Sequence, residues 1–222
     1  MSVPSDLVIA IDGPAGAGKS TVAKRLAKEL NLNFLDTGAM YRALALKAFR
    51  AGLPPEAGDP IAELGEQTRI AFEPGEPQRV MLDDEDVTDA IRKPEIGDLA
   101  SAISVHTPVR RLLVRQQQAL VAQGGYTLEG RDTTTVVAPN AKVRVFLTAS
   151  IEERAKRRFL ELREKGVDCD LNQLRNQIAE RDHRDSSRAD SPLTIAPGVT
   201  VIDTDGLAID EVVARIKALS EA

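Results

Sequence analysis

One short stretch of the sequence carries residues whose types and spacing suit the binding of phosphate. Residues 9–21 read IAIDGPAGAGKST, and Gly13, Gly18, Lys19 and Ser20 complete the pattern G-x-x-x-x-G-K-S. Glycines let backbone N–H groups surround a phosphate, and the helix that follows adds partial positive charge. In this pattern the lysine reaches the β- and γ-phosphates and the serine hydroxyl ligates Mg²⁺. The loop predicted to bind a nucleoside triphosphate with Mg²⁺ consists of Gly13, Pro14, Ala15, Gly16, Ala17, Gly18, Lys19, Ser20 and Thr21.

Two charged stretches further along the chain carry arginines at helical spacing, so that each set shares one helix face. The sets are Arg154, Arg157 and Arg158, and then Arg181, Arg184, Asp185 and Arg188. One interpretation is a pair of solvated helices whose arginines pair with Glu152, Glu153, Glu161 and Glu180. The other is a lid that closes over phosphates, and the phosphate loop upstream favours it.

Short apolar runs and helical repeats alternate along the chain, and these elements must position the charged residues. We predict strands over 7–11, 33–36, 126–130, 143–149 and 199–203, and helices over 19–30, 40–52, 109–122, 150–166, about 171–185 and 207–219. This alternation is typical of an α/β fold, a parallel sheet covered by helices on both faces. The stretch RIAFEPGEPQRVMLDDEDVTDAI (69–91) instead predicts a small antiparallel meander, which we interpret as part of an inserted subdomain.

The composition excludes several classes of protein. The formal net charge is −5 and aromatic residues are few, which argues against a partner that is a nucleic-acid polymer. The single cysteine, Cys169, cannot form an internal disulfide, and no apolar run is long enough to span a membrane. No signal-peptide pattern stands at the N-terminus, so we expect a cytoplasmic protein without a membrane partner.

A phosphate loop alone does not distinguish a kinase from a regulatory GTPase or a motor ATPase. A GTPase should carry an N-K-x-D-type motif, and the string PNAK (139–142) lacks its spacing and its acid. A motor should carry an apolar strand that ends in Asp-Glu, and VMLDDE (80–85) fits a hairpin turn better. A small-molecule kinase needs basic residues at the carboxyl ends of strands, which DTGAMYR (36–42) and EGRD (129–132) offer.

Taken together, these motifs resemble the bacterial cytidylate kinase family, which belongs to the nucleoside monophosphate kinases. The resemblance covers nearly the whole chain and rests on IDGPAGAGKST (11–21), DTGAMYRALAL (36–46), EGRDTTTVV (129–137), FLTASIEERAKRR (146–158) and RDHRDSSRADSPL (181–193). It implies a single P-loop kinase domain over 1–222 with a five-stranded parallel sheet. It also implies a monophosphate-binding insert at about 60–105 and a helical lid at about 150–190.

The resemblance further implies the reaction and the residues that carry it. The γ-phosphate of ATP, the co-substrate, passes to CMP or dCMP with Mg²⁺, which Ser20 ligates, and we expect a monomer. Residues implied to bind CMP are Thr37, Arg42, Ser101, Arg110, Arg131, Asp132, Arg181, Asp185 and Arg188. Residues implied to be catalytic are Lys19, Arg131, Arg154, Arg158, Arg181 and Arg188, and Arg157 joins the phosphate loop in binding ATP.

Several points stay open in the sequence. Ser101 could be an ordinary small helical residue and Arg110 a solvated charge. The acceptor could also be UMP or a non-nucleotide alcohol, and a slowly hydrolysing nucleotide switch is a further alternative. Two residues depart from the family's pattern: Glu129 stands where an aspartate is usual, and Thr134 stands where a glycine is usual. A threonine at position 134 requires the loop to avoid positive φ there or to accept strain.

Overall fold

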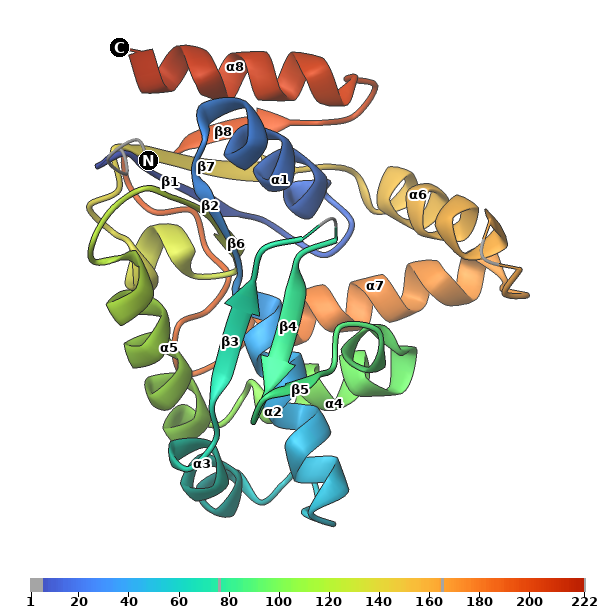
Figure 1. The fold of residues 1–222 in the computed structure, drawn as a ribbon. Coiled ribbons are helices and arrows are strands. Elements are labelled where there is room, and N and C mark those ends of the chain that lie inside the picture. The colour runs from blue at the N-terminus through green and yellow to red at the C-terminus, as the bar shows by residue number, and fades with distance from the viewer. Residues whose placement is uncertain (1–5, 76, 165, 222) are drawn as a thin grey trace. The chain divides into compact units, whose positions relative to one another are not determined.

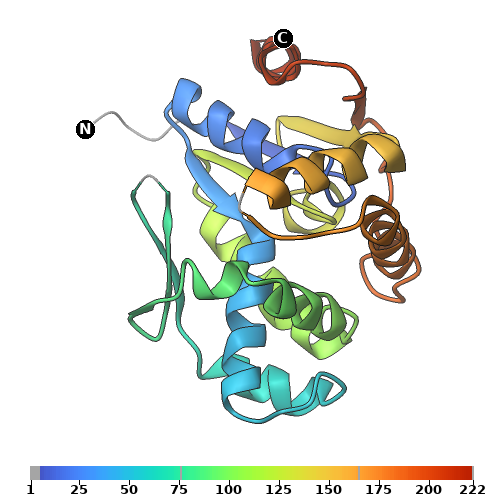
Figure 2. The same ribbon diagram turned by 90° about the vertical axis from the view of Figure 1, so that its right-hand side faces the viewer.

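A computed structural model describes residues 6–75, 77–164 and 166–221 of the chain. The chain divides into two compact units. The first, which we call the sheet unit, comprises Met1–Phe34 with Val121–Ala222, and the second, the 35–120 unit, comprises Leu35–Leu120. Figures 1 and 2 show the elements of both units from two directions.

The sheet unit is built on a five-stranded parallel sheet, as the sequence predicts. Its strands are β1 (Val8–Asp12), β2 (Asn33–Asp36), β6 (Tyr126–Gly130), β7 (Val143–Thr148) and β8 (Thr200–Asp203), in the order β2-β6-β1-β7-β8. The central strand β1 pairs in parallel with β6 on one side and with β7 on the other. The carboxyl ends of β1 and β6, where the phosphate loop and the EGRD motif begin, therefore lie side by side.

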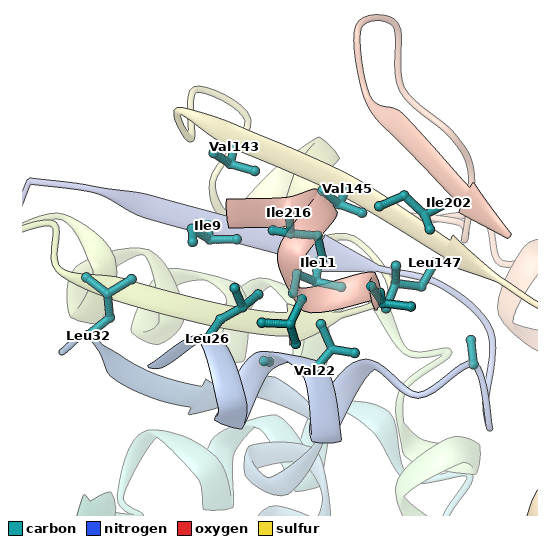
Figure 3. Close-up of a cluster of buried hydrophobic side chains, with 14 residues drawn as sticks. Ile9, Ile11, Val22, Leu26, Leu32, Val143, Val145, Leu147, Ile202 and Ile216 are labelled. Atoms are coloured by element: carbon teal, nitrogen blue, oxygen red, sulfur yellow. The ribbon is translucent and has the colours of Figure 1, made fainter. Parts of the chain in front are cut away.

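Two helices, α1 (Lys19–Leu30) and α8 (Ile209–Glu221), cover one face of this sheet. Figure 3 shows apolar side chains of the helices, among them Leu26 and Ile216, gathered in one cluster with Ile9 and Ile11 of β1. Leu26 is fully buried, and its truncation to alanine would cost about 2–5 kcal/mol. The core is aliphatic because β1 and β7 carry β-branched residues, which suit a strand buried on both faces.

Two further helices of the sheet unit, α6 (Ile151–Glu164) and α7 (Leu171–Ser186), pack against each other, as both ribbon views show. The carboxylate of Asp170 caps α7 by accepting a hydrogen bond of 2.8 Å from the Gln173 amide. Both helices agree with the predicted ranges to within two residues. No helix in the described ranges is long and apolar enough to cross a membrane.

The 35–120 unit combines helices with a small antiparallel sheet. Its elements are α2 (Thr37–Arg50), α3 (Gly58–Glu66), β3 (Ile70–Glu73), β4 (Arg79–Leu82), β5 (Glu85–Asp86), a 3₁₀ turn η1 (Ala90–Arg92), α4 (Pro94–Ile103) and α5 (Thr107–Val121). β3, β4 and β5 pair in order and antiparallel, which confirms the predicted meander. Asp83 and Asp84 connect β4 to β5 with positive φ angles of 48° and 70°. This tight turn excludes the motor-type interpretation of VMLDDE.

Two helices in this unit, α2 and α4, differ from the prediction. α2 begins at Thr37 rather than at Met40, because the carboxylate of Asp36 caps it and accepts a hydrogen bond of 2.9 Å from the Ala39 amide. α4 was not predicted. It begins with Pro94 at its first turn and buries Ile96, Ala100 and Ile103, which are spaced i, i+4, i+7.

Candidate active site

The phosphate loop joins β1 to α1, and its glycines are required by its shape. A Cβ atom on Gly13 would lie 2.0 Å from the carbonyl oxygen of Leu147 on β7. Gly16 and Gly18 adopt φ angles of 80° and 89°, which side chains disfavour. The loop can therefore keep its N–H groups turned inward and start α1 directly after Gly18.

Lys19 is the first residue of α1 and is almost completely buried. Its Nζ atom donates a hydrogen bond of 2.7 Å to the carbonyl oxygen of Pro14, across the loop. Burial lowers the pKa of Lys19 to about 7; the nearby Arg131 and Arg181 also lower it, while Glu129 and Asp12 act in the opposite direction. A triphosphate in the loop would favour the charged form of this lysine.

Ser20 follows Lys19, and its hydroxyl donates a hydrogen bond to Oε1 of Glu129. Glu129 is buried at the end of β6, so the longer side chain at this position reaches the loop directly. A hydroxyl and a carboxylate are hard oxygen donors, and Mg²⁺ is commonly held by one or two such groups together with phosphate oxygens. The pair therefore fits a magnesium ion bound with a nucleotide, and no cluster of three His, Cys, Asp or Glu is found among the described residues.

A buried cluster of opposite charges follows the EGRD motif. Arg131 donates a hydrogen bond of 2.8 Å from Nε to Oδ2 of Asp185 on α7, and Arg188 lies 3.7 Å from the other carboxylate oxygen. Burial alone would raise the pKa of Asp185, but Arg131, Arg181 and Arg188 hold it below its usual value. The structure thus brings together the four predicted residues Arg131, Arg181, Asp185 and Arg188. An excess of positive charge in a buried place suits the binding of phosphate oxygens.

Arg154 on α6 is also buried, and its guanidinium contacts the phosphate loop. It donates hydrogen bonds of 3.0 Å each to the carbonyl oxygens of Ala149 and Ala15, and it pairs at 2.6 Å with Asp182 on α7. Gly16 allows this approach, because a Cβ there would meet the Arg154 side chain at 3.1 Å. Sequence reasoning assigned no role to Asp182; its place one turn before Asp185 on the arginine-rich face is the signal that points to it.

The other two arginines of α6 have different partners. Arg157 donates to the hydroxyl and the carbonyl oxygen of Thr204, at 3.1 and 2.8 Å, and pairs with Glu153. Arg158 pairs with Glu161 at 2.9 Å and is partly exposed. The solvated interpretation with Glu161 as a partner thus describes Arg158 well, whereas Arg154 contacts the phosphate loop. Thr204, the buried partner of Arg157, was not assigned a role from the sequence.

Within the 35–120 unit, the predicted residues Thr37 and Arg42 lie on the first turns of α2. Asp36, which caps α2 before Thr37, also accepts a hydrogen bond of 2.9 Å from Arg92. Arg42 donates to the carbonyl oxygen of Ile91 at 3.0 Å and packs on Gly97, where a Cβ would lie 2.9 Å from Nη1. Two arginines therefore lie by the amino end of a helix, an arrangement suited to a phosphate.

Ser101 and Arg110 lie in the same unit and are both buried. Ser101 is one turn beyond Gly97 on α4, and its carbonyl oxygen accepts a hydrogen bond from the Ser104 hydroxyl at 2.8 Å. Arg110 donates to the carbonyl oxygen of Ser104 at 3.2 Å and lies 5.6 Å from the ring centre of Tyr41. The interpretation of Arg110 as a solvated charge is therefore wrong, because its side chain is almost completely buried.

Asp132, the predicted base contact, is buried at the start of a π-helical turn, Thr133–Val137. Single π turns recur at functional sites. Thr134 does not adopt positive φ in this turn, so the threonine at the family's glycine position carries no backbone strain. Its hydroxyl instead donates a hydrogen bond of 2.6 Å to Asp12 at the end of β1.

Comparisons with known proteins identify the family of the chain. The family model described as cytidylate kinase matches residues 9–222. Cytidylate kinases from Listeria welshimeri and Enterococcus faecalis are 47% and 48% identical to the chain, over 97% and 94% of its length and 96% and 93% of theirs. That of Desulfitobacterium hafniense is 47% identical over 96% of the chain and 92% of its own length.

Solved structures with low sequence identity share the fold. A shikimate kinase from Bacteroides thetaiotaomicron has a TM-score of 0.50 and 14% identity, covering 97% of this chain and 99% of its own. An uncharacterized protein from Eubacterium ventriosum has a TM-score of 0.52 and 14% identity, covering 98% and 100%. The match to the family model and the identity to these relatives place the chain in the cytidylate kinase family.

Proposed function

We propose that the chain transfers the γ-phosphate of ATP to CMP or dCMP, giving ADP and CDP or dCDP. Membership of the cytidylate kinase family supports this reaction over the full length of the chain. The structural observation that supports it most directly is the group of the buried Lys19 and the half-buried Arg131 and Arg181, whose charges act on Lys19 beside the phosphate loop. Such a group can neutralise the charge that spreads over the transferred phosphoryl oxygens.

On the donor side, the loop Gly13–Thr21 would hold the triphosphate through its backbone amides. Lys19 would leave the Pro14 carbonyl oxygen for the phosphates and take its charged form there. Ser20 and Glu129 would hold Mg²⁺, which when bound supplies charge neutralisation for the phosphates. Arg157, beside the loop after β8, would contact the ATP.

On the acceptor side, phosphate and pyrimidine call for different groups. Thr37 and Arg42 by the start of α2 would bind the monophosphate, and Ser101 and Arg110 would donate to the oxygen and nitrogen acceptors of cytosine. Asp132 would accept from the amino group that distinguishes cytosine from uracil. Arg181 and Asp185 would hold the sugar, and Arg131 and Arg188 the acceptor phosphate.

The reaction needs no covalent intermediate. Direct in-line transfer depends on holding the two substrates in register and on stabilising a loose transition state. Arg131, Arg154, Arg158, Arg181 and Arg188 are the proposed catalytic arginines beside Lys19. Among them, Arg154 donates hydrogen bonds to Ala149 and Ala15 and pairs with Asp182. We propose that it also holds α6 against the phosphate loop.

A coupled assay of ADP release from Mg·ATP tests the reaction. CMP and dCMP should stimulate ADP release strongly, UMP weakly and AMP not at all. In the same assay, the Asp132→Asn variant should have a higher KM for CMP and a smaller ratio of kcat/KM for CMP to kcat/KM for UMP. The reason is that a carboxamide has one oxygen acceptor where the carboxylate offers two to the cytosine amino group. Asp210→Asn, at an exposed position of α8, is the matched control. Absence of stimulation by any monophosphate would overturn the proposed function.

Three finer predictions belong to the same proposal: a monomer, a cytoplasmic location, and an acceptor insert at about 60–105 with a lid at about 150–190 in a single domain. Size-exclusion chromatography with light scattering checks the first. Amide exchange with and without ATP and CMP checks the last, because closure on substrates should slow exchange over about 150–190.

A further inference from the structure

A buried carboxylate next to the phosphate loop has no place in the contacts to substrates assigned above. Asp12 is the last residue of β1 and is fully buried. Its Oδ1 accepts hydrogen bonds from the amide and the hydroxyl of Thr133, at 2.7 and 2.8 Å. Its Oδ2 accepts the corresponding pair from Thr134, at 2.7 and 2.6 Å. Four short donors on one buried carboxylate form a strong, geometrically fixed contact.

The donors come from the first residues of the π-helical turn Thr133–Val137. Amides in the first turn of a helix have no partner within that helix. The local capping residue, Asp132, makes no side-chain cap, so Asp12 from a neighbouring strand satisfies these amides. The two hydroxyls add a second donor per residue. A glycine at position 134, usual in the family, would offer its amide alone.

This contact joins the two loops that meet at the carboxyl ends of β1 and β6. Asp12 is followed by Gly13 of the phosphate loop, and Thr133 is preceded by Arg131 and Asp132. β1 and β6 are paired in parallel with Asp12 opposite Gly130, so the two segments that follow these strands leave the sheet at neighbouring positions. The hydrogen bonds between β1 and β6 end there. Beyond them, the Asp12 carboxylate holds the segment after β6 against the phosphate loop.

We propose that Asp12 and Thr134 are positioning residues, which hold the Arg131–Asp132 segment in register with the phosphate loop. This inference rests on the acceptor role proposed for Arg131 and Asp132. Loss of the Thr134 hydroxyl leaves both backbone amides on Asp12 but releases one of the two donors on Oδ2. The segment then gains freedom at the residues that meet the acceptor, while the phosphate loop keeps its own backbone contacts.

Thr134→Val tests the proposal, because it removes the hydroxyl and keeps the shape. We expect kcat/KM for CMP to fall about tenfold, the size of one charge-assisted hydrogen bond, with KM for ATP changed by less than about twofold. Thr134→Ser should restore the wild-type values. Thr127→Val is the matched control, since Thr127 is equally buried on β6 and its hydroxyl has no hydrogen-bond partner within the described residues. Its kinetics should be unchanged.

Several results would overturn the proposal. A Thr134→Val enzyme with unchanged CMP kinetics, even one that melts at a lower temperature, would make the contact purely structural. Equal losses in Thr134→Val and Thr127→Val would do the same, as would failure of Thr134→Ser to restore activity. If Thr134→Val does not fold, Thr134→Ala replaces it with the same expected loss, because alanine also removes the hydroxyl without the backbone freedom of glycine. Asp132→Asn separates the two proposals: unchanged CMP selectivity there contradicts the acceptor role, whatever Thr134→Val shows.

Discussion

The same chemistry, an arginine paired with a carboxylate, occurs in two very different places in this molecule. In the sheet unit, Arg131 and Asp185 pair at 2.8 Å with side chains that are 18% and 5% exposed. In the 35–120 unit, Arg50 and Glu85 pair at 2.6 Å with side chains that are 44% and 55% exposed. The distances alone would suggest that the exposed pair is the stronger one.

Burial reverses that order. The two members of an exposed pair give up contacts with water to contact each other, so the pair adds little to the stability of the folded chain. A buried pair has lost its water, so each member depends on the other, and removing one leaves a charge without compensation. Around Asp185 the arginines Arg131, Arg181 and Arg188 outnumber the carboxylate, which is useful only where further negative charge is to be bound. We therefore expect substitutions in the buried pair to affect activity and stability far more than substitutions in the exposed pair.

The largest effect is expected at Lys19, whose pKa is lowered by burial to about 7. Lys19→Met should lower turnover by at least about 10²–10³-fold, because the proposed role of this lysine is to stabilise the transferred phosphoryl group. Steady-state kinetics at saturating ATP and CMP measure this. Turnover near that of wild type would remove the assigned role.

The same variant also sharpens the comparison through pH. The pKa of Lys19 is about 7 in the folded chain against an ordinary 10.5, so between these values the unfolded chain holds the proton that the folded chain has lost. Wild-type stability should therefore rise with pH across this window, relative to Lys19→Met. The melting temperatures of both proteins at pH 7 and pH 9, measured without nucleotide, test this expectation. An equal change in melting temperature between the two pH values in both proteins would contradict the lowered pKa of Lys19.

Asp185→Asn should have the next largest effect. It leaves Arg131 buried with a weaker partner and removes the proposed sugar contact, so kcat/KM for CMP should fall about 10²-fold and the melting temperature should drop. KM for ATP should change much less. Asp170→Asn on the same helix is the control, because asparagine caps helices as well as aspartate. An unchanged KM for CMP would rule out the sugar contact.

Arg50→Ala should have a small effect, although its pair is shorter. The melting temperature should change by less than about 3 °C, and the difference should vanish in about 0.5 M salt. Differential scanning calorimetry at two salt concentrations measures both. A loss comparable to that of Asp185→Asn would break the distinction between buried and exposed pairs.

The smallest expected effect is a gain in stability at the turn beside Glu85. Asp84 holds a φ of 70°, which glycine adopts without cost, so Asp84→Gly should stabilise the chain by about 0.5 kcal/mol. Asp84→Asn keeps the turn and removes the charge, and it should be neutral. Urea unfolding of the three proteins measures the difference, and destabilisation by glycine would contradict the positive-φ account of this turn.

The sequence predicted most of the fold because its signals are local. The five strands, the phosphate loop and α1 follow from β-branched runs, glycine spacing and helical periodicity, all read within a few residues. α4 escaped because its apolar residues follow a proline-bounded segment that reads as a loop. The early start of α2 depends on the Asp36 cap, which is visible only when the carboxylate is known to reach the Ala39 amide.

The site was predicted less completely, because its partners are far apart in the chain. The motif singled out Ser20, but its contact with Glu129 joins residues on α1 and β6. Arg154 was expected to face phosphates from its helical spacing, from the phosphate loop upstream and from the family resemblance. The contacts of Arg154 with Ala15 and Asp182 depend on how α6 packs on the phosphate loop and on α7. The residue spacing within α6 does not predict that packing.

The threonines at 133–135 have a consequence for the unfolded chain. Three successive β-branched residues have fewer accessible backbone and rotamer states than the glycine-containing family loop, so less conformational entropy is lost when this segment becomes ordered. Thr134 reaches its native conformation without a positive φ. The smaller loss of entropy is therefore not offset by backbone strain in the folded state. On the proposed function, the segment that would present Arg131 and Asp132 to CMP therefore becomes ordered during folding at a lower entropic cost than a loop that contains glycine.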